Sequence, residues 1–304
     1  MNHPNVRSTM SAVPGRTERI GEILVRMGAL APTDVDRVVE LQAKTGGSFG
    51  HVAVRQSLVT VDQVRAALAY QFGYVSAQGA DIPTGMSNEL IMLFDSMGRN
   101  AERIRILRSH LMIHHFQNGE RTLAVTGVGR GSGASYVAAN LATSIAQLGR
   151  RVLLVDTNLR APRLRDLFGI ESNVGLSDAL AGRASIDSVL MSNLIENMAI
   201  LPAGTIPPNP QELLGSPRFQ ELMAQLKTVF GVIILDTCGE EGIADADQVW
   251  NESRNVLLVA RQGRSRYALA QHMAESVRAM GGNVVGTVIN NYAGPPVRRR
   301  RKHL

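Results

Sequence analysis

The sequence lacks several features that mark secreted or membrane-spanning proteins. It holds one cysteine, Cys238, which excludes an intramolecular disulfide framework and fits a reducing compartment. No apolar run approaches the ~20 residues that a helix needs to cross a bilayer. The opening segment MNHPNVRSTMSAVPGRTER lacks the apolar core of a secretory signal. We therefore expect a cytoplasmic protein.

Positive charge is concentrated in one short stretch near the end of the chain. The formal net charge is +6, and RRRRK (298–302) supplies five of those charges, so the rest of the chain is nearly neutral. Such a cluster could meet anionic lipid, nucleic acid or an acidic partner. The plainer interpretation, a solvated and disordered terminus, is favoured, and we expect no nucleic-acid partner.

Composition shifts divide the chain into five segments. Hydrophobic residues make up 44% and charged residues 19%, which is typical of a globular protein. The predicted segments are a disordered start (1–17), a helical repeat unit (18–75), a linker (76–95), an alternating strand–helix domain (96–292) and a basic tail (293–304).

The helical unit contains an internal repeat. IGEILVRMGALAPTDVDRVVELQ (20–42) aligns without gaps, at an offset of 29, to FGHVAVRQSLVTVDQVRAALAYQ (49–71). Each copy predicts a short helix, a turn and a second helix, and Pro32 suits the first turn of a helix. We expect two helical hairpins that cover each other's apolar faces and serve as a small docking domain.

Beyond the linker, apolar segments alternate with helical patterns. The predicted strands are short and β-branched, as in strands buried on both faces: 122–126, 151–156, 198–203, 231–236, 255–260 and 283–290. The predicted helices are 134–149, 174–196, 210–228, 243–252 and 266–280. This order predicts an α/β fold with a mostly parallel sheet and helices on both faces, preceded by the small all-α unit. Ligands of such sheets bind beyond the carboxyl ends of the strands.

A glycine-rich turn lies at the first of those ends. VTGVGRGSGASY (125–136) joins a strand to a helix, so backbone N–H groups and the positive end of the helix would cradle a phosphate. Asp156 and Asp236 end two other strands, and Ser135 stands where a Mg²⁺-binding hydroxyl belongs. Asn290, at the end of the last strand, either reads an adenine edge or simply shapes a turn. The predicted nucleotide-binding residues are Gly129, Arg130, Gly131, Ser132, Gly133, Ala134, Ser135, Tyr136, Arg160 and Asn290.

Two longer segments resemble a known family. VLLVDTNLRAPRLRDLFGIESNVGLSDALAGRASI (152–186) and LPAGTIPPNPQELLGSPRF (201–219) are similar to the bacterial tyrosine kinases of polysaccharide export. The resemblance implies a P-loop fold, ATP or ADP with Mg²⁺ held through Ser135, Asp156 and Asp236, and a catalytic set of Asp156, Asn158 and Asp236. It also implies a membrane chain-length determinant as partner, which would bring the protein to the inner face of the plasma membrane.

The same resemblance assigns a role to one predicted helix. Glu102, Arg105 and Arg108 match the E-x-x-R-x-x-R pattern through which these kinases assemble into rings. The alternative is intrahelical Glu–Arg pairing at a spacing of three residues, worth a few tenths of a kcal/mol. We favour the oligomer contact.

Four positions depart from the kinase pattern. Ala134 replaces the lysine of the phosphate loop, Asn158 replaces an aspartate, and Asp236 is followed by Thr-Cys-Gly instead of Thr-Pro-Pro. A tyrosine cluster near the end is absent, and only Tyr292 lies there. One cause, relaxed need for chemistry, explains all four, so we favour a pseudokinase that acts in a ring or beside an active kinase. The alternatives are a working autokinase and, remotely, a partitioning ATPase of the same superfamily.

The helical repeat has its own resemblance. It is similar to the N-terminal domain of type II secretion and pilus-assembly ATPases, some of which bind cyclic di-GMP. Carried over residue by residue, the candidates are Arg19, Gly21, Gly28, Gln42, Gly50 and Gln71. The second copy has Ser48 for the arginine and Ser57 for the glycine, so protein docking is favoured over nucleotide binding.

Overall fold

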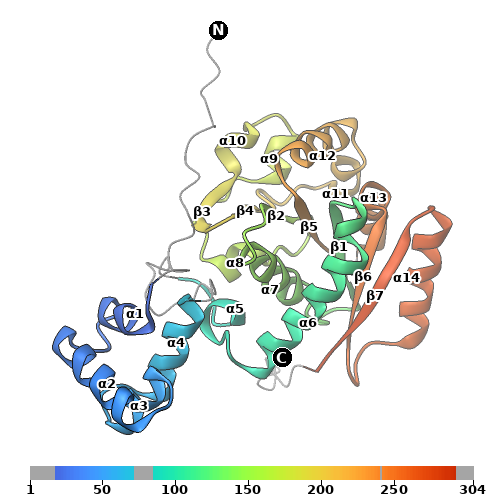
Figure 1. Cartoon of the computed structure of the whole chain (residues 1–304). Helices are drawn as coiled ribbons and strands as arrows, with labels where there is room; N and C mark the ends of the chain where they lie inside the picture. Colours follow the sequence, from blue (N-terminus) through green and yellow to red (C-terminus); the bar gives the residue numbers. More distant parts are fainter. Residues whose placement is uncertain (1–17, 72–84, 240–241, 292–304) are drawn as a thin grey trace, which may run out of the picture. The chain divides into compact units, whose positions relative to one another are not determined.

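The computed structural model describes residues 18–71, 85–239 and 242–291 (Figure 1). They divide into two compact units: residues 18–71 with 91–103, and residues 85–90 with 104–291. The predicted disordered start, the basic tail and Tyr292 lie outside the described residues. Within the described ranges, no helix is both long and apolar enough to cross a membrane. The predicted domain limits stay predictions.

The first unit is built from the predicted repeat. α1 (Ile20–Arg26) and α2 (Pro32–Thr45) form one hairpin, and α3 (Phe49–Arg55) and α4 (Val61–Gln71) form the next. Pro32 occupies the first turn of α2, as predicted. Ile23 and Leu24 of the first copy share a buried cluster with Val52 and Ala53 of the second. The two hairpins therefore cover each other's apolar faces.

Gly28 and Ser57 end the first helix of each copy with the same backbone conformation. Their φ angles are 66° and 55°, in the left-handed region that glycine tolerates and serine rarely adopts. Their amide N–H groups donate to equivalent carbonyls, those of Val25 and Val54. The serine of the second copy therefore keeps the turn of the first at some cost in backbone strain.

The second unit is a seven-stranded sheet with the order β3-β4-β2-β5-β1-β6-β7. All neighbouring strands are parallel except β3 and β4, so the predicted fold class is confirmed. The strand bounds are β1 Thr122–Val128, β2 Val152–Asp156, β3 Met191–Ile195, β4 Met198–Leu201, β5 Val232–Thr237, β6 Asn255–Arg261 and β7 Asn283–Asn290.

Helices cover both faces of this sheet (Figure 1). α7 lies against β1, β2 and β5, whereas α13 and α14 lie against β1 and β6 from the other face. The remaining helical bounds are α5 Ile91–Phe94, α6 Arg99–His114, α7 Ala134–Ala146, α8 Leu164–Phe168, α9 Leu176–Leu180, α10 Ile186–Val189, α11 Pro210–Leu214, α12 Pro217–Val229, α13 Ile243–Ser253 and α14 Tyr267–Ala279, with a short 3₁₀ turn at Phe116–Asn118.

The prediction of one helix over residues 174–196 was wrong. It forms α9, α10 and the edge strand β3, which pairs antiparallel with β4. The chain leaves the helical conformation at Gly182 and turns back to β4 at Asn197, both with positive φ. The apolar residues of β3 suit either period, and pairing with β4 decided between them. The predicted helix 210–228 is likewise two helices. The second begins at Pro217, and the Ser216 side chain caps it by accepting the Phe219 N–H.

Candidate functional site

The phosphate loop joins β1 to α7 at the carboxyl edge of the sheet. Gly129, Gly131 and Gly133 have φ angles of 82°, 72° and 91°, which an L side chain adopts only with strain. Gly133 directly precedes α7, so the first N–H groups of that helix face the concave side of the loop. The side chain of Asn290, at the end of β7, donates to the Ser132 carbonyl at 3.0 Å and so ties the loop to that strand.

The loop forms the floor of a pocket of about 770 Å³. Its other walls come from the segments that follow β2 and β5, as expected for a parallel sheet. Every residue predicted to bind nucleotide lines this pocket: the loop 129–136, Arg160 and Asn290. Asn158 lines it as well. The fold therefore brings together residues that are spread over more than 160 positions of the sequence.

Asp156 and Asp236 lie side by side, because they are register partners on the neighbouring strands β2 and β5. Both are buried. The oxygens of Asp156 accept three backbone N–H bonds, from Asn158 at 3.2 Å, Arg163 at 3.1 Å and Leu164 at 3.0 Å. Burial nevertheless raises the pKa of Asp156 to about 6, against the lowering effect of those bonds. Asp156 therefore organises the loop that leads into α8.

Asp236 differs from its neighbour in its carboxylate, which accepts no backbone N–H from the described residues. Neither carboxylate oxygen has a hydrogen-bond partner in the part of the chain that the structure describes. Burial raises the pKa of Asp236 well above its ordinary value, and the charge of Asp156 raises it further. The nearby Ser135 hydroxyl and the Arg163 guanidinium act in the lowering direction. A buried carboxylate without donors is an expensive feature unless a ligand uses it.

Comparison with known proteins assigns this unit to a family. The family model described as "Cellulose biosynthesis protein BcsQ" matches residues 121–283, which is more than half of the chain. The chain belongs to this family. That range includes the phosphate loop, both strand-end aspartates and the sheet as far as the start of β7.

Several individual relatives of this chain are named tyrosine-protein kinases. "Tyrosine-protein kinase YwqD" of Bacillus subtilis (strain 168) is 29% identical over 205 residues, covering 67% of this chain and 86% of that protein. "Tyrosine-protein kinase wzc" of Salmonella typhimurium is 35% identical over 190 residues, covering 62% of this chain and only 26% of that protein. The solved structure of the chimerical protein CapA2B2 has a TM-score of 0.64 at 28% identity, covering 74% of this chain and 97% of its own. The predicted relationship to bacterial tyrosine kinases is confirmed.

Ala134, where the resemblance to the kinases predicts a lysine, begins α7. Its methyl group carries neither charge nor donor, so the pocket depends on backbone N–H groups at this point. Asn158 is likewise turned to structural use: its amide donates to the Ala161 carbonyl at 3.0 Å and accepts from the Ala161 N–H at 3.2 Å. Arg160 pairs with the buried Asp245 on α13 through two bonds, at 2.5 Å and 3.0 Å. Two side chains predicted to serve nucleotide are therefore engaged within the fold.

The residues present fit a Mg²⁺ ion in one respect. Asp236 offers two unpartnered oxygens beside the Ser135 hydroxyl, and Mg²⁺ in nucleotide sites takes one or two carboxylates together with phosphates and water. Among the described residues, no cluster of three or more His, Cys, Asp or Glu side chains forms a self-sufficient metal site. Any ion here would need the phosphates of a ligand.

Cys238, next to the strand-end aspartate, is not a nucleophile. Its thiol is buried and donates to the Gly242 carbonyl at 3.0 Å. Burial, with the charge of Asp245, raises its pKa to about 12, so the thiolate is absent at neutral pH. Cys238 therefore acts in packing the turn after β5.

The three residues of the proposed oligomer motif have different environments. Arg108 is buried, and its guanidinium donates to the carbonyl and hydroxyl oxygens of Ser144 on α7, at 3.0 Å and 3.1 Å. Glu102 is exposed and Arg105 is half-buried. Arg108 thus binds its own unit, and an oligomer contact would rest on Glu102 and Arg105.

The cyclic di-GMP candidates occupy structural positions in the helical repeat. Arg19 precedes α1, where its N–H donates to Glu22 at 3.0 Å. Gln42 donates to the Gly47 carbonyl at 3.0 Å, and Gln71 donates to the Glu18 carbonyl at 2.9 Å. Gly21 and Gly50 are buried where helices meet, and Gly28 forms the turn described above. A binding role for these six residues stays a prediction.

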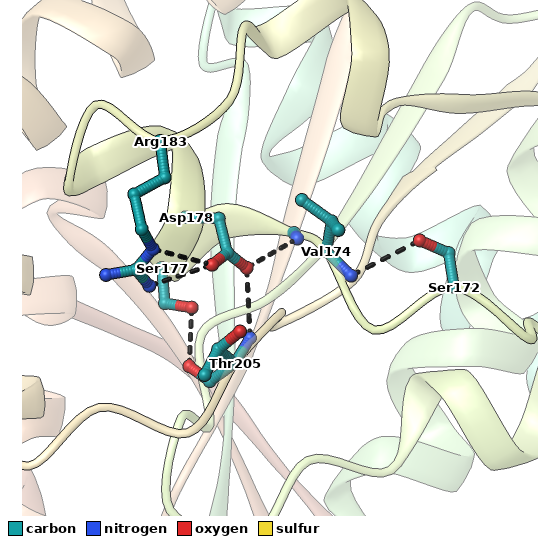
Figure 2. A network of polar contacts seen from close by, with 7 residues as sticks. Ser172, Val174, Ser177, Asp178, Arg183 and Thr205 are labelled. Carbon is teal, nitrogen blue, oxygen red and sulfur yellow. Dashed lines mark hydrogen bonds and ion pairs between the residues drawn. The ribbon is translucent and has the colours of Figure 1, made fainter.

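The family-specific LPAG segment is held by a polar network that sequence inspection did not find (Figure 2). Asp178 in α9 accepts the N–H groups of Gly175 at 3.1 Å and Thr205 at 3.0 Å, and two bonds from the Arg183 guanidinium. Ser177 donates to the Thr205 carbonyl at 2.6 Å. Thr205 meets Asp178 and Ser177 from 27 and 28 positions away, so no local spacing signal could have shown these contacts.

Proposed function

We propose that this protein is a tyrosine-kinase-like nucleotide-binding protein of exopolysaccharide synthesis whose phosphoryl-transfer activity is largely lost. Its kinship with proteins named tyrosine-protein kinases and with a family described by cellulose biosynthesis supports the first part. The observation that carries the second part is the pocket itself. It retains the glycine loop, and the buried Asp236 lies beside Ser135 of that loop, but a methyl group stands where the resemblance to the kinases predicts a lysine.

The effect of the missing lysine on nucleotide affinity can be estimated. A charge-assisted hydrogen bond to an anion contributes about 1.5–3 kcal/mol, or roughly 10- to 150-fold in affinity. The loop N–H groups and the end of α7 remain, so weak binding survives on this proposal. Catalysis suffers more, because the lysine's charge would stabilise the transferring phosphoryl group.

The remaining residues have assigned tasks in this proposal. The loop N–H groups from Gly129 to Ser135 bind the phosphates, and Asp156 holds the wall formed by the β2–α8 segment. Asp236 and Ser135 would hold a Mg²⁺ ion, which supplies charge neutralisation to the phosphates when bound. The adenine contact of Asn290 stays a prediction, because that side chain already donates to the Ser132 carbonyl.

A calorimetric titration with Mg-ATP and Mg-ADP, on the unmodified protein and on Ala134→Lys, tests the proposal. We expect millimolar-range binding for the former and affinity roughly 10-fold or more higher for the latter. Leu148→Lys is the matched control, since it adds the same charge at an exposed position beyond the far end of α7. Phosphotyrosine blotting after incubation with Mg-ATP reads the chemistry in the same samples.

The alternative function, an active autokinase with unusual motifs, makes the opposite prediction. Micromolar binding of ATP together with autophosphorylation by the unmodified protein would refute the pseudokinase proposal. If nucleotide binds tightly without phosphorylation, only the catalytic part of the proposal stands.

The partners are proposed from the relatives. A membrane chain-length determinant would recruit this protein to the inner face of the plasma membrane, and a ring or a mixed oligomer with an active kinase would form through Glu102 and Arg105. Light scattering after size-exclusion chromatography tests the assembly. Arg105→Ala should lower the mass if this contact exists, whereas an unchanged oligomer would reject it.

For the helical repeat unit we infer protein docking. Both glutamines of the cyclic di-GMP set donate to carbonyls inside the repeat, and the backbone N–H of Arg19 serves the start of α1, which supports a scaffold role. Titration of the full chain with cyclic di-GMP separates the two interpretations. A heat change at micromolar nucleotide that disappears in Arg19→Ala would replace docking by nucleotide sensing.

A further inference from the structure

The turn that follows β6 is fastened to the phosphate loop. Arg261, the last residue of β6, lines the pocket, and its Nη1 donates to the Gly131 carbonyl at 3.3 Å. The Ser265 hydroxyl donates to the Val128 carbonyl at 2.5 Å and accepts the Arg261 N–H at 2.8 Å. Arg264 also lies at the loop, with its Nη1 3.5 Å from where a side chain on Gly131 would begin. Two guanidinium groups thus stand at the centre of the loop.

Two other arginines that line the pocket have carboxylate partners. Arg160 is paired with Asp245, and Arg163 is paired with Glu89 at 2.9 Å, so a carboxylate balances each of these charges. Arg261 differs in that it contacts the phosphate loop itself. Arg261 is the last residue of β6 and not part of the loop, and the bond from its guanidinium to the Gly131 carbonyl holds its charge at the loop.

A pocket for polyphosphate needs positive charge in this chain more than in a lysine-bearing relative. Asp156 and Asp236 place two buried carboxyl groups beside the loop. The end of α7 supplies the equivalent of only about half a positive charge. Guanidinium suits the task because its charge is permanent and its planar donors match phosphate oxygens.

We propose that Arg261, assisted by Arg264, is the phosphate-binding cation of this pocket and takes over the electrostatic role of the lysine replaced by Ala134. The ligand class is a nucleoside di- or triphosphate, so the proposal rests on the nucleotide-binding function above. Arg261 is a binding residue here. The bond to the Gly131 carbonyl positions its charge at the loop before the ligand arrives.

The test is a double-mutant cycle read by calorimetry with Mg-ATP, Mg-ADP and AMP. Arg261→Met is made in the unmodified chain and in Ala134→Lys. Arg261→Lys is the conservative variant, and Arg266→Met is the matched control, an exposed arginine of the same turn that does not line the pocket. Circular dichroism melting curves show that each variant is folded.

We expect Arg261→Met to weaken Mg-ATP binding roughly 10-fold or more, and Arg266→Met by less than about 2-fold. Arg261→Lys should recover most of the loss. In the Ala134→Lys background the cost of Arg261→Met should fall, because the added lysine already supplies the charge. The loss should also shrink from ATP to ADP to AMP.

Three outcomes would overturn the proposal in different ways. If Arg261 merely holds the Gly131 carbonyl, its removal costs the same in both backgrounds and for all three nucleotides. If the unmodified protein binds Mg-ATP and Arg261→Met binds it equally well, this inference fails while the proposed function stands. If the unmodified protein and Ala134→Lys both bind no nucleotide at millimolar concentration, both fail together.

Discussion

Two buried aspartates of the same unit have opposite properties. Asp178 is 4% exposed and Asp236 is 1% exposed. Burial alone would raise the pKa of Asp178, but the N–H of Thr205 and the guanidinium of Arg183 outweigh it and lower the pKa to about 2. Asp236 has no such donors, and its pKa lies well above the ordinary 3.8. Their partners, rather than their depth, separate them.

The difference separates a carboxylate that is satisfied by donors within the fold from one that is not. A carboxylate with a full set of donors stabilises the fold, whereas one without donors costs stability at neutral pH. Asp178 ties α9 to the LPAG segment (Figure 2), and Asp236 faces Ser135 at the phosphate loop. The carboxylate near the phosphate loop thus lacks the donors that satisfy the carboxylate of the Asp178 network.

Removing the structural carboxylate should have the largest effect on stability. Asp178→Ala leaves the N–H groups of Gly175 and Thr205 and the Arg183 guanidinium without their acceptor, so we expect a loss of about 3 kcal/mol in the free energy of unfolding. Urea denaturation at pH 7 measures it. Asp187→Ala, an exposed aspartate on α10, is the control and should cost under about 0.5 kcal/mol. Equal losses in the two variants would contradict the network's role.

The pH dependence of Asp178 follows from its lowered pKa. Its contribution is fully present above the unfolded value of 3.8 and is lost as the pH falls through about 2. The wild-type protein should therefore lose more stability between pH 5 and pH 2 than Asp178→Ala does. Parallel acid profiles of the two proteins would show that the carboxylate carries no special stabilisation.

Neutralising the ligand-free carboxylate should have the opposite sign and a smaller size. Asp236→Asn removes a buried charge without partners, so we expect a gain of about 2 kcal/mol at pH 8 together with loss of Mg-nucleotide binding. A raised pKa gives stability that is full below 3.8 and declines as pH rises toward the folded value, and this part of the decline should vanish in the variant. The Asp156 carboxyl, whose pKa burial raises to about 6, adds a decline of its own, which remains in the variant but moves along the pH axis because the neighbouring Asp236 charge is gone.

Thermal and urea unfolding between pH 4 and pH 8, with and without Mg-ADP, measures both effects of Asp236→Asn. A variant that is no more stable than the wild type at pH 8, and that still binds Mg-ADP, would remove Asp236 from the ligand site.

Removing the partner of Asp178 should have the smallest effect. The Arg183 side chain is 56% exposed, and its ion pair with Asp178 is therefore largely screened by water. Arg183→Ala should cost under about 1 kcal/mol, because the two backbone N–H bonds to Asp178 remain. A loss as large as that of Asp178→Ala would place the stabilisation in the ion pair, and urea unfolding of the two variants decides it.

Much of the fold could be predicted from local patterns. Runs such as 151–156 and 231–236 indicated buried parallel strands because each holds four consecutive apolar side chains, 152–155 and 232–235. The repeat at an offset of 29 predicted two equivalent hairpins. The antiparallel strand Met191–Ile195 could not be predicted, because its apolar spacing also suits a helix and only pairing with β4 distinguishes them.

The sequence by itself determined the phosphate loop, its neighbouring aspartates and the absence of lysine at Ala134, because these are fixed by residue type at a strand end. Only the tertiary structure decided which side chains remain for a ligand. Arg108, Arg160 and Asn158 are engaged inside the unit, whereas Asp236 has no donor and Arg261 lies at the loop from a strand more than 120 residues away. Apart from the local Asn158–Ala161 contact, these hydrogen bonds join chain segments that meet only on folding, and no spacing rule encodes them.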